Sequence, residues 1–187
     1  HWGFRCAGGH PTDRAEGQDL LLDAAAALEL LQAFALIHDD VMDDADSRRG
    51  SPTAHVVFAG RHDREGWRAE ARRFGESVAI LLGDLAHVWA DALVADAPPR
   101  ARAVWRELSV EVMMGQYLDV LGTARGATSV EQARRIARLK SGRYTIERPL
   151  QLGAALAGAD DSLLETLSGF GAPLGEAFQL RDDVLGV

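Results

Sequence analysis

The chain has 187 residues, of which 47% are hydrophobic and 26% charged, with a formal net charge of −8. This length is typical of one domain, here residues 1–187, and the apolar content is ample for a core. The acidic balance argues against nucleic-acid partners and anionic membrane surfaces. Cys6 is the single cysteine, which excludes an internal disulfide and fits a reducing, cytoplasmic compartment. No run approaches about 18 uninterrupted apolar residues, so we expect no transmembrane segment.

Apolar residues recurring at three- and four-residue spacing predict an all-α domain of about six or seven helices. The first long pattern begins at Asp19 and runs into an acidic segment near residue 40. Ser129 is expected to cap a later helix that has Gln132 in its first turn. We expect a short connection with a helical turn over 51–60, a solvated loop leading into a helix over 61–73, and a helix break around Pro173. Other patterns predict helices over 76–95, 100–121 and 174–187, and a helix and a turn over 150–157 and 161–168.

The acidic segment contains five aspartates: Asp39, Asp40, Asp43, Asp44 and Asp46. On a helix, Asp39 and Asp43 lie one turn apart on the same face, where like charges cost about 0.2–0.5 kcal/mol per pair. A bound cation would offset that cost, and Mg²⁺ typically takes one or two carboxylates and completes its shell with water and phosphate. Arg48 and Arg49 follow directly, and their planar guanidinium groups suit bidentate phosphate recognition. This order predicts a metal–diphosphate site; a solvated acidic helix end is the alternative.

Residues 38–50 resemble the first aspartate-rich motif of the trans-isoprenyl diphosphate (polyprenyl) synthases, which is Asp-Asp-x-x-Asp followed by Arg-Arg-Gly. The likeness recurs at intervals to the end of the chain. It implies the isoprenoid synthase fold, a helical bundle whose two aspartate motifs face each other across a deep central cavity. It also implies that Mg²⁺ is the cofactor. The metal candidates under this resemblance are Asp39, Asp40, Asp43, Asp119, Asp182 and Asp183.

The resemblance extends to polar residues outside the first motif. Gln32 stands where the family carries a His or Gln that contacts the homoallylic diphosphate. Gln116 and Asp119 form an i, i+3 pair that faces the metal–diphosphate cavity in the family. Lys140 is the only lysine among twenty basic residues, and the family's Lys-Thr or Lys-Ser at this place binds the allylic diphosphate. The implied substrate-binding residues are Gln32, Arg48, Arg49, Gln116, Lys140, Ser141 and Gln179, and the implied catalytic residues are Lys140, Tyr144 and Gln179.

The second aspartate-rich motif matches the family in part. Asp182 and Asp183 stand at its start, and Gln179 lies three residues earlier on the same helix face. The fifth position of the motif is Gly186 instead of an aspartate, which puts full metal occupancy at this motif in question. The resemblance also leads us to expect that the sequence lacks the family's N-terminal Gly-Gly-Lys-Arg-x-Arg-Pro segment and its basic C-terminal end.

The implied activity is prenyl transfer, in which isopentenyl diphosphate condenses with an allylic diphosphate through a carbocation, in a homodimer. Phe34 and Ala35 lie just before the first motif, and Leu31 lies about one turn deeper. Synthases of this family with an aromatic residue and a small neighbour at this place often stop at twenty carbons, so the resemblance implies geranylgeranyl diphosphate as the product, with farnesyl diphosphate as the second choice.

Three other functions stay open. The chain fits an inactive partner subunit of a heteromeric synthase, because Gly186 weakens the second motif. A class I terpene cyclase fits less well, because the sequence contains no asparagine for its usual metal triad. A helical scaffold with fortuitous acids is the third alternative.

Overall fold

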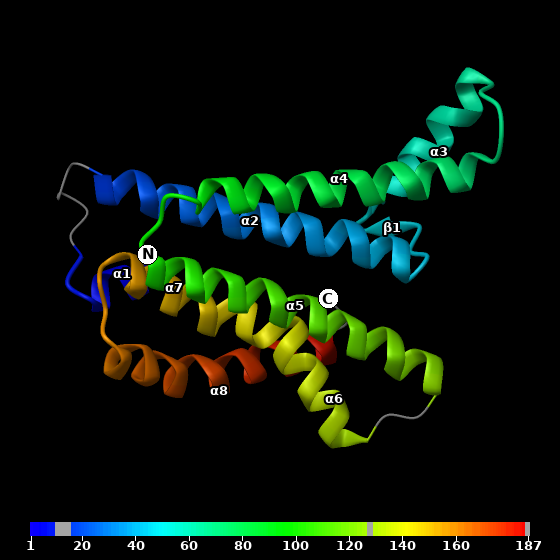
Figure 1. The fold of residues 1–187 in the computed structure, drawn as a ribbon. Coiled ribbons are helices and arrows are strands. Elements are labelled where there is room, and N and C mark those ends of the chain that lie inside the picture. The colour runs from blue at the N-terminus through cyan, green and yellow to red at the C-terminus, as the bar shows by residue number, and fades with distance from the viewer. Residues whose placement is uncertain (10–15, 127–128, 186–187) are drawn as a thin grey trace. The chain divides into compact units, whose positions relative to one another are not determined.

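The structure, a computed structural model, describes residues 1–9, 16–126 and 129–185 (Figure 1). These residues contain eight α-helices, one π-helix and one two-stranded hairpin, so the all-α prediction is confirmed. Contacts divide the chain into two compact units, His1–Ala25 with Leu93–Val187, and Ala26–Ala92. The single domain over residues 1–187 stays a prediction.

Two long helices dominate the unit of residues 26–92. They are α2 (Glu16–Met42), which begins in the other unit, and α4 (Ala71–Leu93). They run side by side in Figure 1, and Gly83 explains how they approach, since a Cβ there would overlap the imidazole ring of His38. Along the chain, the two long helices are separated by β1 (Ser47–Arg48), β2 (Ser51–Pro52) and α3 (Ala54–Glu65).

The predicted short connection over 51–60 and solvated loop over 61–73 are wrong for most of their length. Helix α3 occupies most of both ranges, and α4 begins at Ala71. The buried face of α3 carries His55 and His62, whose ring nitrogens bond to Thr53 Oγ1 at 3.2 Å and to the Arg68 carbonyl at 2.9 Å. Because histidine counts as polar in a hydrophobic pattern, this short helix gave no apolar periodicity.

Helix α2 is long and apolar enough to cross a membrane over Asp19–Met42, where one 18-residue stretch has a mean hydropathy of 1.9. The sequence led us to expect no transmembrane segment. A core helix of a soluble protein meets the same criteria of length and hydropathy, so this property assigns α2 to neither environment.

The other unit is built from α1 (Trp2–Cys6), α5 (Pro99–Arg125), α6 (Val130–Ala137), the π-helix η1 (Arg138–Glu147), α7 (Arg148–Leu156) and α8 (Asp161–Leu185). Its core lies where the apolar faces of α5, α7 and α8 meet, with Leu108 and Leu152 almost fully buried. The predicted cap of α6 is confirmed, because the Gln132 N–H donates to Ser129 Oγ at 3.2 Å and the Gln132 side chain accepts from the Ser129 N–H.

The helix break predicted at Pro173 is also wrong, because α8 continues through it. A proline inside a helix removes one hydrogen bond and costs about 3 kcal/mol. Packing opposes that cost here. Gly171 and Gly175 bring the α8 backbone against η1 at Glu147 and Gly142, on both sides of the proline. The position of Gly186 lies outside the described residues.

Candidate active site

The first aspartate motif ends α2. The Asp43 N–H donates to the Asp39 carbonyl at 2.8 Å, which places the two residues one helical turn apart on the same face, as predicted. Asp39 is partly buried and Asp43 is exposed. Asp40 differs from both, because only 5% of it is exposed. Asp39 and Asp43 supply carboxylate oxygens, which are the ligands that Mg²⁺ prefers.

A short hairpin returns the chain to this helix end. Strands β1 and β2 pair antiparallel around Arg49 and Gly50, whose φ angles are 52° and 78°. Two successive positive φ angles are typical of the type I′ turn that joins twisted strands. The turn brings Arg48 back to α2, where its Nε donates to Asp40 Oδ1 at 2.7 Å and its Nη2 to Asp39 Oδ2 at 3.1 Å.

Arg48 therefore ties two carboxylates of the motif together. Burial of its guanidinium opposes the positive charge, but the hydrogen bond and negative charge of Asp40, aided by Asp39, raise the pKa of Arg48 above its ordinary value. The sequence predicted that Arg48 binds a diphosphate and that Asp40 is a metal candidate. In the structure the two residues bond to each other, so the contacts to ligands stay predictions.

Arg49 stands exposed at the tip of the hairpin. A left-handed backbone at a residue other than glycine costs of order 1–3 kcal/mol and is found mostly where the surrounding structure fixes it, often at binding sites. Thr53 supplies part of that support, because its Oγ1 donates to the Ala45 carbonyl at 2.7 Å and its N–H to the Asp46 carbonyl at 3.1 Å. The hairpin therefore presents an arginine next to the aspartates.

The residues predicted to set product length lie along α2 before the motif. The Phe34 ring makes edge contacts with His38 at 4.7 Å and with His87 of α4 at 4.9 Å between ring centroids. His38 in turn donates from Nε2 to the Ile80 carbonyl at 3.0 Å. Leu31, one turn earlier, is 1% exposed. Phe34 is thus held between two imidazole rings, and Ala35 beside it is partly buried.

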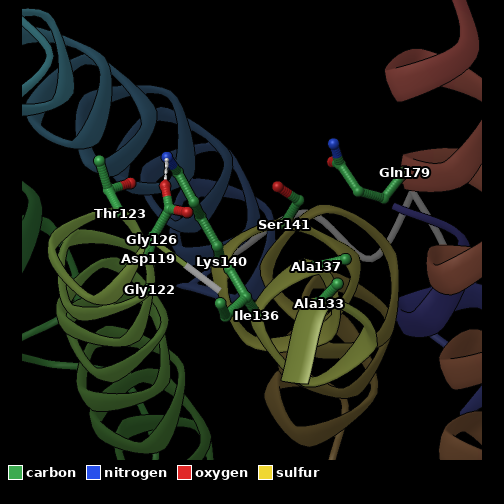
Figure 2. A pocket seen from close by; sticks show the side chains of 10 residues that line it. All are labelled: Asp119, Gly122, Thr123, Gly126, Ala133, Ile136, Ala137, Lys140, Ser141 and Gln179. Carbon is green, nitrogen blue, oxygen red and sulfur yellow. Dashed lines mark hydrogen bonds and ion pairs between the residues drawn. The ribbon is translucent and has the colours of Figure 1, made fainter. Parts of the chain in front are cut away.

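A second cluster lies in the other unit, around a cavity of about 540 Å³ (Figure 2). Lys140 Nζ donates to Asp119 Oδ2 at 2.6 Å. Figure 2 shows this pair on one side, contributed by η1 and α5, and the side chain of Gln179 on the other, contributed by α8. Ser141 also lines the cavity. Four residues that the sequence singled out separately are therefore brought together here.

Lys140, Ser141 and Tyr144 all belong to the π-helix η1, which the sequence did not predict. Wide turns of this kind are rare and occur frequently at functional sites. Glycines allow the neighbouring helices to pack closely against η1. A Cβ at Gly115 of α5 would overlap the backbone N of Lys140. On the opposite side, Gly142 meets the backbone of Gly175. In the sequence, the close approach of α5, η1 and α8 is signalled by the glycines at these contacts.

A buried network of charges follows Tyr144, and sequence reasoning missed it. Arg148 donates to both carboxylate oxygens of Glu111, at 2.8 and 2.7 Å. These hydrogen bonds outweigh its desolvation and raise the pKa of Arg148. Arg143 pairs with Glu111 and donates to Glu147 Oε2 at 3.1 Å. Glu147 is 1% exposed and also accepts from Ser168 Oγ at 2.8 Å.

The remaining predicted residues are partly buried on three helices, with Gln32 on α2, Gln116 on α5 and Asp182 near the end of α8. The side chain of Asp183 lies outside what the structure describes. Among the described residues, no three His, Cys, Asp or Glu side chains converge closely enough to hold a metal ion by themselves.

Residues 6–187 match the family model described as Polyprenyl synthetase. The chain belongs to the polyprenyl synthetase family. The resemblance inferred from the aspartate motifs is therefore confirmed. A geranylfarnesyl diphosphate synthase of Aeropyrum pernix is 34% identical over 181 residues, which cover 92% of this chain and 52% of the relative. A geranylgeranyl diphosphate synthase of Methanosarcina mazei is 36% identical, with 88% of this chain and 48% of the relative covered.

Among solved structures, a geranylgeranyl pyrophosphate synthase of Corynebacterium glutamicum, complexed with isoprenyl diphosphate and magnesium, has a TM-score of 0.92 and 44% identity to this chain. The match covers 100% of this chain and 54% of that one. The predicted isoprenoid synthase fold is confirmed. The chain spans about half the length of the relatives it matches.

Proposed function

We propose that the protein is a Mg²⁺-dependent prenyltransferase that condenses isopentenyl diphosphate with an allylic diphosphate, head to tail. The observation that carries this proposal is the pair Asp39 and Asp43, one helical turn apart beside the Arg48–Arg49 hairpin, in a chain of the polyprenyl synthetase family. The acids are donors for a hard cation, and the arginine at the tip is suited to phosphate.

We assign each site residue of this chain one role in the proposed reaction. Asp39 and Asp43 would hold Mg²⁺, which would supply Lewis-acid and electrostatic stabilisation of the departing diphosphate. Asp182 is a further metal candidate that the family resemblance implies. Arg48 keeps Asp39 and Asp40 in place. Lys140, which Asp119 orients, binds the allylic diphosphate as a compact point charge. Gln32, Gln116, Ser141 and Gln179 complete the substrate contacts.

The proposed reaction breaks one C–O bond and forms one C–C bond. The C–O bond of the allylic diphosphate breaks, both bonding electrons leave with the diphosphate, and an allylic cation remains. The double bond of isopentenyl diphosphate, whose own diphosphate Arg49 holds, attacks this cation and forms the new C–C bond. Loss of one proton then restores a double bond. The Tyr144 hydroxyl stabilises the cation, and exclusion of water protects it from quenching.

Phe34→Ala is expected to lengthen the product beyond twenty carbons. The proposed product is geranylgeranyl diphosphate, with farnesyl diphosphate as runner-up, because the Phe34 ring is clamped by His38 and His87 and can close the path of the growing chain. Removing the ring opens that path and leaves Asp39 unchanged. The measurement is chromatography of the dephosphorylated products of parent and variant, with Phe58→Ala as a control on another helix. An unchanged product would locate the floor at Leu31 or on a facing helix.

We also propose a homodimer that works in the cytoplasm. Helix α4 exposes a stripe of large apolar side chains that the rest of its own unit leaves uncovered: Leu81, Leu85, Val88 and Trp89. Such a stripe is typical of a helix that packs against another subunit. Sedimentation equilibrium should give twice the monomer mass for the parent, and Val88→Glu with Trp89→Ala should give the monomer mass. A parent that sediments as a monomer would contradict the dimer.

One assay tests the proposed activity. Purified full-length protein is incubated with Mg²⁺, labelled isopentenyl diphosphate and dimethylallyl, geranyl or farnesyl diphosphate in turn. We expect a prenyl diphosphate product that disappears when EDTA removes the metal. An inactive partner subunit would give no product alone. A terpene cyclase would release a hydrocarbon from an allylic diphosphate without isopentenyl diphosphate, and a helical scaffold would bind neither substrate.

A further inference from the structure

The π-helix that carries Lys140 is fixed at its C-terminal end by the buried carboxylate of Glu147 and by partly buried charged side chains around it. Glu147, its last residue, is 1% exposed and accepts hydrogen bonds from Ser168 of α8 and from Arg143 of η1 itself. Arg143 pairs in addition with Glu111 of α5. The last turn of the π-helix is therefore bonded to the helices on both of its sides.

A π-helix needs such support more than an α-helix does. Its i→i+5 turns are rare because they are less favourable than α-helical turns, and they persist where tertiary contacts hold them. A return to α-helical winding would rotate and translate the residues before Glu147 relative to those after it. Lys140 and Ser141 lie toward the opposite end of η1 from Glu147. Such a shift would therefore move the Lys140 amine and the Ser141 hydroxyl at the cavity.

We propose that Glu147 is a positioning residue that holds the π-helical register of η1 and thereby places Lys140 and Ser141 for binding the allylic diphosphate. Ser168 and Arg143 act with it as the two donors that fix its carboxylate. The proposal rests on the proposed function for the identity of the ligand. It adds a residue that is buried and does not line the cavity of Figure 2.

Glu147→Gln and Ser168→Ala test this role. The first keeps the shape of the side chain and removes its charge, and the second removes only one donor. In the full-length protein we expect both to raise the KM for the allylic diphosphate, about tenfold for Glu147→Gln, with the KM for isopentenyl diphosphate nearly unchanged. The Kd for inorganic pyrophosphate with Mg²⁺, measured by titration calorimetry, should rise in parallel.

Two control variants remove similar groups elsewhere in the same unit. Thr166→Ala deletes a hydroxyl on α8 that bonds to the Ser162 carbonyl, and Asp161→Asn weakens the exposed pair of α8 with Arg100. Both should keep the constants of the parent. A Glu147 that served stability alone would lower the melting temperature of its variant and leave the KM and Kd of the folded protein unchanged.

A double variant with Lys140 shows whether Glu147 acts by positioning Lys140 or by stabilising the unit in general. In a Lys140→Ala background, Glu147→Gln should raise the Kd for pyrophosphate by less than about twofold, since residues that act through one another are not additive. Full additivity overturns the proposal, as do parent-like constants in both single variants. If Glu147→Gln fails to fold, the KM and Kd of Ser168→Ala test the proposal in its place. A parent that binds pyrophosphate without turnover overturns the proposed function alone, and a parent that binds none overturns both.

Discussion

Asp39→Asn and Asp43→Asn should each lower kcat by about two to three orders of magnitude. Loss of one carboxylate weakens the hold on Mg²⁺, and the stabilisation of the leaving diphosphate that is lost corresponds to about 3–4 kcal/mol. Both side chains lie on one face of α2, one turn apart, so each variant should be about equally damaging. The measurement is steady-state turnover with saturating substrates over a range of Mg²⁺ concentrations, where the variants should also require more metal.

Asp44→Asn is the matched control. Asp44 belongs to the same acidic segment, but its carboxylate pairs with Arg72 of α4 at 3.3 Å. It should keep the activity of the parent. The variants at the motif should stay folded, because Asp40 still holds Arg48 when Asp39 is changed. Near-normal turnover in Asp39→Asn or Asp43→Asn would refute the metal assignment.

The first aspartate motif could be predicted from the sequence because its evidence is local. An apolar helical pattern runs directly into the acids, and the helix period alone places Asp39 and Asp43 on one face. What the sequence did not show is the hairpin that folds Arg48 back onto Asp39 and Asp40. Strands of two residues are too short to give an alternating pattern, and the turn places Arg49, which is not a glycine, at a positive φ.

The second cluster depends on contacts between residues that are distant in the sequence. Lys140 and Asp119 were each identified as site residues, but their ion pair spans 21 positions and requires η1 to lie against α5. The same holds for Glu111 and Arg148, which are 37 positions apart. The π-helix was missed because a pattern of apolar residues counts α-helical turns, and ten residues are too few to reveal a different period.

Lys140→Arg should lower kcat/KM for the allylic diphosphate by about tenfold or more, although the charge is kept. The amine of Lys140 is a compact charge that approaches Asp119 Oδ2 to 2.6 Å at the wall of the cavity. A guanidinium is wider and planar, so it cannot take the same place between Asp119 and a diphosphate oxygen. We expect a raised KM for the allylic substrate and a lowered kcat, with a smaller effect on the KM for isopentenyl diphosphate.

The control for this exchange is Arg138→Lys, the reverse substitution two residues earlier in the same π-helix. Arg138 is exposed and pairs with Glu176 at 3.4 Å, so the shape of its cation should not matter and the kinetics should match the parent. Lys140→Ala sets the scale for complete loss of the charge. If Lys140→Arg matches the parent while Lys140→Ala does not, the site requires a positive charge of either shape. If both match the parent, the single lysine of the chain takes no part in binding the diphosphate, and the cavity around Asp119 and Gln179 is not the allylic site.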